Sequence, residues 1–315
     1  MPRQPQRIGS ELMADLFAGA AAADQAGPKQ MAFEGFNLSR VDVGEATLRV
    51  RHGGSGPPLL LLHGYPETHM MWSRVADDLA RDFTVIAPDL RGYGESTAPA
   101  TTPDHETYSK RAMARDAVAL MRHFGFDRFN LAGHDRGGRV AYRLALDHPD
   151  VLLKLSILDI IPTADVWKRA NKAFALAYWH WSFLAQAHPF PETVIGADPE
   201  YFLFRGSRGM FDPAAYADYV RCLANPAMVH AICEDYRAGA SYDVAADEAD
   251  RGKTRIKVPV QVLWGSKGAL AAWYDVLAIW RDWADDVQGH AIESGHFIPE
   301  ENPAETLKAL RAFFL

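Results

Sequence analysis

The sequence predicts an α/β protein with a mostly parallel central sheet, helices on both faces and a helical cap inserted into the chain. Three observations lead to this prediction. From Thr47 onward, short runs of β-forming residues alternate with amphipathic stretches, a pattern typical of parallel strands joined by helices. The alternation breaks after Pro162, and it returns at Val260. The block between these two points is therefore expected to cover the strand ends, where a ligand cleft would form.

The expected elements follow from this alternation in chain order. Short apolar runs predict strands at Leu59–His63, Phe83–Asp89, Phe129–Gly133, Leu155–Asp159, Val260–Gly265 and near His290–Glu293. Amphipathic spacing predicts helices at Trp72–Arg81, Ser109–Phe124 and Gly137–His148. The middle block is rich in Trp, Tyr, Phe and Ala, and helix boundaries are expected at Pro189, Pro191, Pro199, Pro213 and Pro226.

This organisation divides the chain into three parts. Residues 1–35 are rich in Ala, Gln and Gly without sustained periodicity, so a flexible N-terminal arm is expected there, with an oligomer contact as the alternative. Residues 36–161 and 256–315 should form the α/β core, and residues 162–255 the helical cap.

Composition narrows the possible functions. The 33 Lys and Arg against 40 Asp and Glu give a net charge of -7, which argues against nucleic acid or anionic lipid as a partner. The two cysteines, Cys222 and Cys233, form neither a disulfide framework nor a four-thiolate zinc site. No stretch resembles a signal peptide or approaches the roughly 20 apolar residues of a membrane span. A soluble, cytoplasmic protein is expected.

The most informative motif is Gly133-His134-Asp135-Arg136-Gly137, between a predicted strand and a predicted helix. This context is that of a nucleophile elbow, where the central side chain is held in a sharp turn. Here the central residue is Asp135. A plain glycine-rich connection, in which Asp135 merely caps the helix, is the alternative.

A carboxylate nucleophile indicates a particular chemistry. If Asp135 displaces a leaving group from a saturated carbon, the product is an ester of its side chain. Water can open that ester at the carboxyl carbon, whereas serine would form an ether without a comparable route to hydrolysis. The motif therefore predicts displacement at an sp³ carbon.

Hydrolysis of such an ester needs a base and an oxyanion site. His296, in the Ser294-Gly295-His296-Phe297 loop after the last predicted strand, is the expected base for the water. The His63-Gly64-Tyr65-Pro66 turn follows a predicted strand directly. The backbone amides of Tyr65 and Arg136 are expected to form the oxyanion hole.

An imidazole base needs a carboxylate that fixes its tautomer. Asp159 ends the strand before the cap, whereas the Gly265–Leu270 loop contains no acid and Asp275 lies farther along. Asp159 is the predicted orienting acid, and Asp275 is the alternative.

Taken together, the HGYP turn, the GHDRGGR elbow, the LDIIPT segment, the YWHW and DYRAG runs and the GSKG and SGHF loops resemble haloacetate dehalogenases of the fluoroacetate dehalogenase type. That family belongs to the α/β-hydrolase superfamily, and the resemblance spans roughly residues 38–315. It implies an α/β-hydrolase fold and conversion of haloacetate (fluoroacetate or chloroacetate) and water to glycolate and halide through an aspartyl ester. It implies no metal or organic cofactor, a small 2-haloacid as the molecular partner, and a homodimer.

The resemblance also implies residue roles. Asp135 would be the nucleophile, with Asp159 and His296 completing the triad. Arg136 and Arg139 would hold the substrate carboxylate. The implied halide site consists of His180, Trp181 and Tyr236.

The two arginines also make sense from their spacing. Three residues apart at the start of a helix, Arg136 and Arg139 can lean toward the same space beside Asp135 and present guanidinium groups to a carboxylate. A surface salt-bridge role is the alternative. Such a pair would bind a small anion within an acidic protein.

One stretch departs from the family. Residues 200–212 are shorter than usual and contain no Trp, so Phe204 or Met210 would have to fill the far wall of the pocket. A roomier wall would favour chloroacetate, bromoacetate or a 2-halopropionate over fluoroacetate.

Three other functions remain as alternatives. An epoxide hydrolase would use the same nucleophile with cap tyrosines, for which Tyr201, Tyr216, Tyr219 and Tyr236 are candidates. A neutral epoxide, however, gives the arginine pair nothing to bind, and the same objection applies to a haloalkane dehalogenase. A non-enzymatic ligand receptor would be expected to lack part of the nucleophile, base and acid set.

Overall fold

The computed structural model describes residues 32–204 and 209–315. Its centre is an eight-stranded sheet in the order β1-β2-β4-β3-β5-β6-β7-β8. The strands are β1 (Asn37–Asp42), β2 (Thr47–Gly53), β3 (Pro58–Leu62), β4 (Thr84–Pro88), β5 (Phe129–His134), β6 (Leu152–Leu158), β7 (Val260–Gly265) and β8 (Val287–Ile292). The neighbouring strands β4, β3, β5, β6, β7 and β8 all pair in parallel. At the other edge of the sheet, β2 pairs antiparallel with both β1 and β4.

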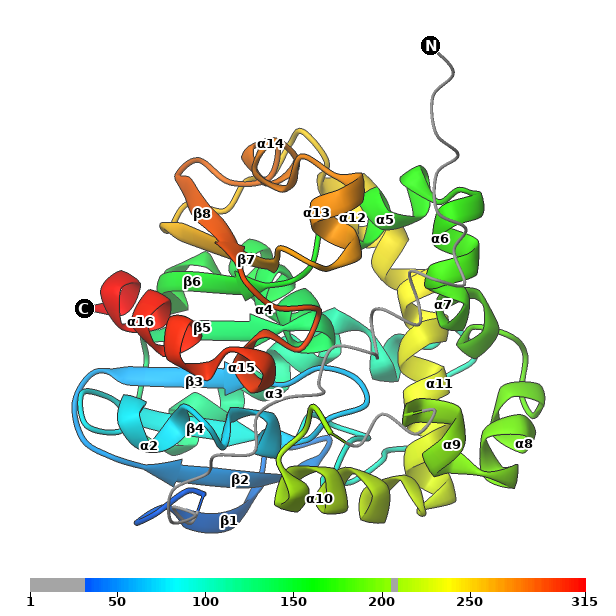
Figure 1. Ribbon diagram of the computed structural model, residues 1–315, viewed down its shortest axis with the longest axis horizontal. Coiled ribbons are helices and arrows are strands. Elements are labelled where there is room, and N and C mark those ends of the chain that lie inside the picture. Colours follow the sequence, from blue (N-terminus) through cyan, green and yellow to red (C-terminus); the bar gives the residue numbers. More distant parts are fainter. Residues whose placement is uncertain (1–31, 205–208) are drawn as a thin grey trace.

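Helices cover both faces of the sheet (Figure 1). In that view α2 (Ala76–Leu79), α15 (Ile298–Glu301) and α16 (Pro303–Phe314) lie in front of the strands, and α3 (Lys110–His123) and α4 (Asp135–Asp147) lie behind them. The central strands β3 and β5 are buried along nearly their whole length. This agrees with the continuous apolar runs from which they were predicted.

The chain between β6 and β7 is helical. It contains α5 (Thr163–Arg169), α6 (Lys172–Ala177), α7 (Trp179–Leu184), α8 (Phe190–Ala197), α9 (Pro199–Phe204), α10 (Pro213–Leu223), α11 (Pro226–Ala240) and α12 (Tyr242–Asp250). Pro199, Pro213 and Pro226 are the first residues of their helices, as predicted, because a proline lacks only an amide that has no helical acceptor there. Helices α6 to α11 lie at the ends of the parallel strands, on the right of Figure 1.

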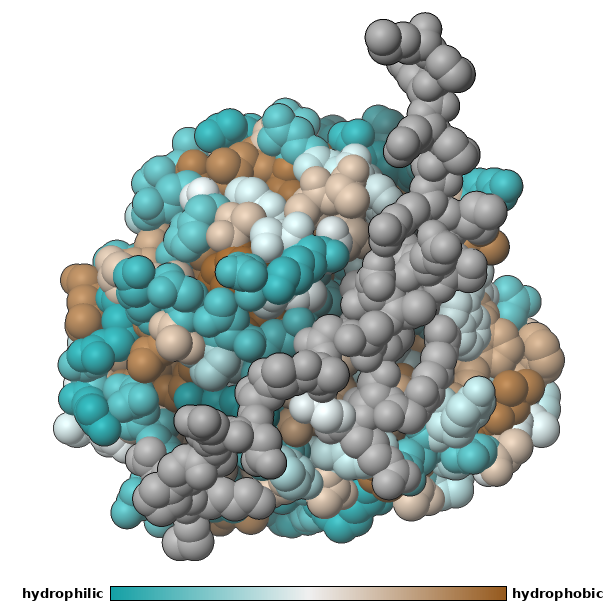
Figure 2. All heavy atoms as spheres, viewed as in Figure 1, coloured by the Kyte–Doolittle hydropathy of each residue, from teal (hydrophilic) through white to brown (hydrophobic). Residues whose placement is uncertain are grey.

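Shorter elements complete the chain. They are the single-turn helices η1 (His69–Trp72), η2 (Glu106–Tyr108) and η3 (Pro149–Val151), together with α13 (Ala269–Trp273) and α14 (Val276–Arg281). On the face seen in Figure 2, apolar residues gather at the right-hand edge over α8, where Phe190 and Val194 are exposed.

The sequence-based elements need four corrections. The helix predicted at Trp72–Arg81 is two short pieces, η1 and α2, with Ser73, Arg74 and Val75 between them. Strand β8 begins at Val287 rather than near His290, because it pairs with the whole of β7. Strand β1 was not predicted, since its polar residues are mostly exposed at the sheet edge. Helix α4 begins at Asp135 itself rather than at Gly137.

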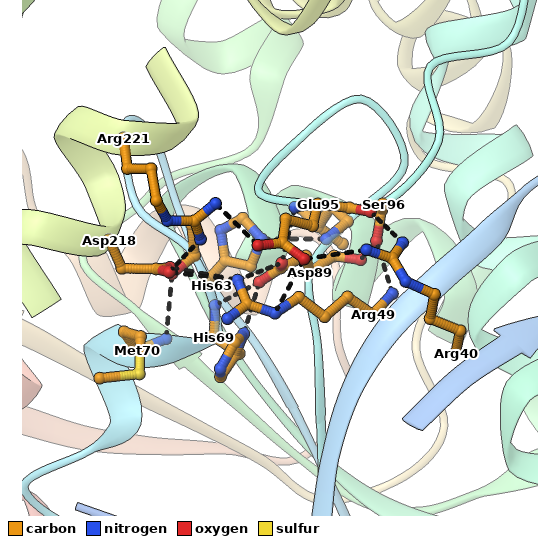
Figure 3. Close-up of polar contacts among 12 residues, drawn as sticks. Arg40, Arg49, His63, His69, Met70, Asp89, Glu95, Ser96, Asp218 and Arg221 are labelled. Atoms are coloured by element: carbon orange, nitrogen blue, oxygen red, sulfur yellow. Dashed lines mark hydrogen bonds and ion pairs between the residues drawn. The ribbon is translucent and has the colours of Figure 1, made fainter. Parts of the chain in front are cut away.

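A polar network ties α10 to the core next to the strand ends (Figure 3). Asp218 accepts hydrogen bonds from Arg49 on β2 (3.2 Å) and from the Thr68 hydroxyl (2.7 Å). Arg49 also lies 3.6 Å from the buried Asp89, which binds the His69 ring (2.7 Å). Because Asp89 and His69 are fully buried, this network fixes the lower end of the helical segment onto the sheet.

The predicted arm, residues 1–35, lies mostly outside the described residues. In its last part, Phe33 is buried and its ring packs edge-on against Phe36, with 5.2 Å between centroids. No helix in the described parts of the chain has the length and apolar character needed to cross a membrane.

Candidate active site

Asp135 sits in a strained turn between β5 and α4. Its φ of 41° lies in the left-handed region that L-residues rarely adopt. The turn depends on two glycines: a Cβ on Gly137 would lie 2.4 Å from the His63 carbonyl oxygen, and one on Gly133 would lie 2.5 Å from the Gly137 oxygen. Close packing of β3, β5 and α4 therefore leaves no room for a side chain at either position, and Asp135 is pushed out at the strand end.

The Asp135 carboxylate is buried and accepts the backbone amide of Tyr65 (3.1 Å). Burial alone would raise its pKa, but His296, Arg139 and Arg136 outweigh burial and hold the pKa below its ordinary value. Asp135 is thus ionised and able to act as a nucleophile. The Arg136 amide is in the first turn of α4, where backbone N–H groups have no helical acceptor.

His296 and Asp159 lie on the loops that follow β8 and β6. The His296 Nδ1 is 2.6 Å from one Asp159 oxygen, and the Gly265 amide donates to the other (2.9 Å). This contact places the proton of His296 on Nδ1 and leaves Nε2 as the acceptor. Asp275, the alternative acid, instead caps α14 by accepting the Ala278 amide (3.0 Å).

Arg136 is fully buried and already bound to a carboxylate of the protein. Its Nε and Nη2 donate to the two Asp235 oxygens, each at 2.8 Å. Asp235 also accepts from the Tyr93 hydroxyl (2.7 Å) and from Lys110. The sequence led us to expect that Arg136 would bind a substrate carboxylate through two of its nitrogens. The Nε and Nη2 edge of the guanidinium is occupied by Asp235 instead. Its Nη1 is buried without a partner in the described ranges.

Arg139 lines the pocket beside Asp135. Its Nη1 donates to the Ile161 carbonyl and to the Thr163 hydroxyl, both at 3.1 Å. Its Nε is also buried, and no group of residues 32–204 or 209–315 accepts from it. Each arginine thus keeps a buried donor that no described residue satisfies, which is costly unless a ligand accepts it.

His180, Trp181 and Tyr236 come together around the arginines. The Tyr236 ring lies 5.9 Å from His180 and 6.1 Å from Trp181, measured between centroids. The Arg136 guanidinium lies 4.2 Å from the Tyr236 ring, and that of Arg139 lies 4.5 Å from Trp181. Burial and the Asp135 charge raise the Tyr236 pKa well above its ordinary value, so its hydroxyl stays a donor.

The pocket itself is mainly aromatic. Its lining combines predicted site residues with residues from the inserted helices and from around α13. The lining residues are Tyr65, Pro66, Asp135, Arg139, Asp159, Ile161, Val166, Phe174, Ala177, Tyr178, Trp179, His180, Trp181, Phe202, Leu203, Phe204, Leu270, Trp273, Tyr274, His296 and Phe297. Phe204, but not Met210, is part of this wall. Trp179 and Tyr178 also line it.

The cap tyrosines considered for an epoxide hydrolase mostly lie elsewhere. Tyr201 is 67% exposed, Tyr216 donates to Glu200 (2.7 Å), and Tyr219 donates to Glu300 (3.0 Å). Only Tyr236 of those four lies among the residues around Arg136 and Trp181.

Sequence reasoning missed several residues at the site. Tyr274 and Trp273 are brought in by α13, and no motif marks them. Asp235 lies within the DYRAG run, but its partner Lys110 is 125 positions away. Only the tertiary structure brings such groups together.

One group could hold a metal ion. In the described parts of the chain, His188, Glu192 and His230 place ligand atoms within 4.8 Å of one another on the surface of the inserted helices. Arg237 donates to both Glu192 oxygens (2.8 and 3.1 Å), so its charge opposes a cation there.

Comparisons with known proteins identify the fold family. The family model described as alpha/beta hydrolase fold matches residues 57–303. The chain belongs to the α/β-hydrolase family. A fluoroacetate dehalogenase from Burkholderia sp is 46% identical to this α/β hydrolase over 288 residues, covering 89% of this chain and 94% of the relative. The predicted resemblance to that type and the predicted fold class are thereby confirmed.

Other relatives carry different descriptions. A soluble epoxide hydrolase from Corynebacterium sp. (strain C12) is 34% identical over 274 residues, covering 83% of this chain and 91% of the relative. The solved structure of an α/β hydrolase from Nostoc sp PCC 7120 superposes with a TM-score of 0.88 at 50% identity, covering 89% of this chain and 98% of that one. A Pseudomonas aeruginosa protein described as an epoxide hydrolase gives 0.85 at 46% identity, covering 90% and 97%.

Proposed function

We propose that this α/β hydrolase is a haloacetate dehalogenase that converts fluoroacetate or chloroacetate and water to glycolate and halide. One observation carries the proposal: two buried guanidinium groups, Arg136 and Arg139, act electrostatically on the buried, ionised Asp135, and each keeps a donor without a partner among the described residues. A small carboxylate would satisfy both donors. The Burkholderia relative is a fluoroacetate dehalogenase, which agrees with this substrate class.

In the proposed first step, Arg136 Nη1 and Arg139 Nε hold the substrate carboxylate. An Asp135 oxygen forms a bond to the carbon bearing the halogen, and the halide leaves with the electron pair of the carbon–halogen bond. His180, Trp181 and Tyr236 would donate to the departing ion. Several donors are needed because a small halide such as fluoride is strongly hydrated in water.

In the proposed second step, His296 Nε2 takes a proton from water, and the resulting hydroxide attacks the carboxyl carbon of the ester. The Tyr65 and Arg136 amides would stabilise the oxyanion; the contact of the Tyr65 amide with Asp135 supports this role. Collapse expels the glycolate oxygen, which takes the proton held on His296. The regenerated Asp135 carboxyl then releases its own proton to solvent. No metal or organic cofactor is needed.

The epoxide hydrolase alternative is favoured by a different observation. Tyr178 lines the pocket with Asp135, Tyr236 lies nearby, and a Corynebacterium relative is an epoxide hydrolase. An epoxide, however, leaves both arginine donors unsatisfied.

A cytoplasmic location and a homodimer stay predictions.

Halide release from fluoroacetate and chloroacetate, measured together with glycolate, tests the proposal. Equimolar halide and glycolate are expected from the wild type, and none from Asp135→Asn. A His296→Gln variant should release one equivalent of halide and retain an ester on Asp135. Halide from neither substrate, with turnover of an epoxide, would overturn the dehalogenase in favour of the alternative.

A further inference from the structure

Two buried carboxyl groups that the proposed chemistry does not use lie next to the catalytic loops. Glu67 follows the HGYP turn and is fully buried, and Glu300 on α15 is 1% exposed. The two side chains are within hydrogen-bonding reach of each other. Oε1 of Glu67 and Oε2 of Glu300 are buried and find no donor among the residues described. Two ionised carboxylates cannot bond to each other, so one added proton would satisfy both oxygens.

The remaining oxygens contact three parts of the site directly and a fourth through His134. Glu67 Oε2 accepts the Gly64 amide of the oxyanion turn (3.1 Å) and lies 3.1 Å from Nδ1 of His134. The other His134 nitrogen, Nε2, lies 2.8 Å from the backbone carbonyl oxygen of His296. Glu300 Oε1 accepts the Tyr219 hydroxyl of α10 (3.0 Å). This pair therefore connects the turn that contains Gly64, the elbow that contains His134, the loop of His296 and helix α10.

The hydrogen bonds also fix the number of protons. The His296 carbonyl can only accept, so Nε2 of His134 carries a proton. Nδ1 and Glu67 then share another, either as imidazolium and carboxylate or as imidazole and carboxylic acid. With the proton between Glu67 and Glu300, the three side chains are neutral as a group. Loss of that proton would leave the two facing oxygens without a donor between them and the group with a net negative charge close to Asp135.

We propose that Glu67 and Glu300 share one proton and act as positioning residues for the catalytic loops. While the proton is present, the pair holds Gly64 and, through His134, the His296 loop in place. Its loss at alkaline pH separates the two side chains, loosens both loops and produces the alkaline limb of the activity profile.

The charges around the pair agree with a retained proton. Burial raises the pKa of Glu67 to about 7, and the neighbouring Asp135 adds to this, while Glu300 and the His296 ring act in the opposite direction. Burial and then the Glu67 charge raise the pKa of Glu300 well above its ordinary value, against the smaller effects of Tyr219 and Arg74. Arg74 also donates to the Glu300 backbone carbonyl.

The first test is the pH profile of kcat for Glu300→Gln. The amide can donate to Glu67 without a titrating proton and can still accept from Tyr219, so we expect the alkaline limb to move up by at least about one pH unit. Tyr219→Phe removes a donor that favours ionised Glu300, and should also shift the limb upward, by less. Glu305→Gln, an exposed carboxyl on the adjacent α16, is the control and should leave the limb unchanged.

This turnover readout rests on the proposed function, but an unfolding readout does not. The folded pair keeps a proton that unfolded glutamates release, so it contributes stability at acid pH that is lost as the pH rises through the pKa of the pair. The thermal midpoint of the wild type should fall between about pH 5 and pH 9 more steeply than that of Glu300→Gln. Equal slopes in wild type, Glu300→Gln and Tyr219→Phe would overturn the shared proton, whatever the substrate. Unequal slopes without haloacetate turnover would support the shared proton and count against the proposed function alone.

Discussion

Replacing Asp235 with Asn tests how Arg136 is held. Asp235 is fully buried and balances two buried cations, Arg136 and Lys110. Asn keeps the shape and one accepting oxygen but removes the charge, so Arg136 loses its carboxylate partner and Lys110 loses the nearer of its two. Breaking a buried ion pair by removing one partner costs about 3–5 kcal/mol of unfolding free energy. We expect a loss in this range, because Asp243 lies 3.7 Å from Lys110 and compensates only that cation in part.

Urea unfolding at neutral pH, followed by circular dichroism, measures this loss. Asp285→Asn is a matched control, since Asp285 also binds one arginine and one lysine, Arg255 (2.5 Å) and Lys257 (2.9 Å), but on the surface. Solvent screens that cluster, so its midpoint should hardly change. A loss in Asp235→Asn no larger than in Asp285→Asn would refute the view that burial makes the Arg136 pair essential to the folded site.

Three further predictions concern the triad, the pH dependence of stability and the elbow. Asp159→Asn should lower kcat by about 10³- to 10⁴-fold through loss of the orienting carboxylate, whereas Asp275→Asn should retain activity; equal losses would remove Asp159 from the triad. Burial raises the pKa of Asp247 to about 6, so its contribution to stability is complete below about pH 4 and is lost as the pH rises through 6. Asp247→Asn, which can still accept from Ala164 and Tyr142, should flatten the stability profile by roughly 3 kcal/mol between about pH 4 and 7 in urea titrations, and an unchanged slope would contradict this. Gly137→Ala should prevent folding because its Cβ would meet two carbonyl oxygens at 2.4 and 2.5 Å, whereas Gly196→Ala, with open space around it, should fold normally; recovery of soluble protein and its thermal midpoint decide between these outcomes.

The sequence alone was enough to predict the parallel-sheet architecture and the order of its elements. Buried strands such as Leu59–Leu62 read as continuous apolar runs, and the elbow needs glycines at fixed spacing, so both leave a local signal. The family resemblance rested on motifs of the same local kind. By contrast, the edge strand β1 left no such signal, because only Val41 within it is buried.

The candidate site divides in the same way. Asp135, Asp159 and His296 each follow a strand, so their meeting at one edge of the sheet could be predicted from a parallel topology. Only the tertiary structure decided that the fork of Arg136 binds Asp235, and that Glu67 meets Glu300, because the partners lie 99 and 233 positions apart on elements with no shared local pattern. Local sequence sets backbone conformation within a few residues, whereas the partner of a buried charge is set by which distant segments pack together.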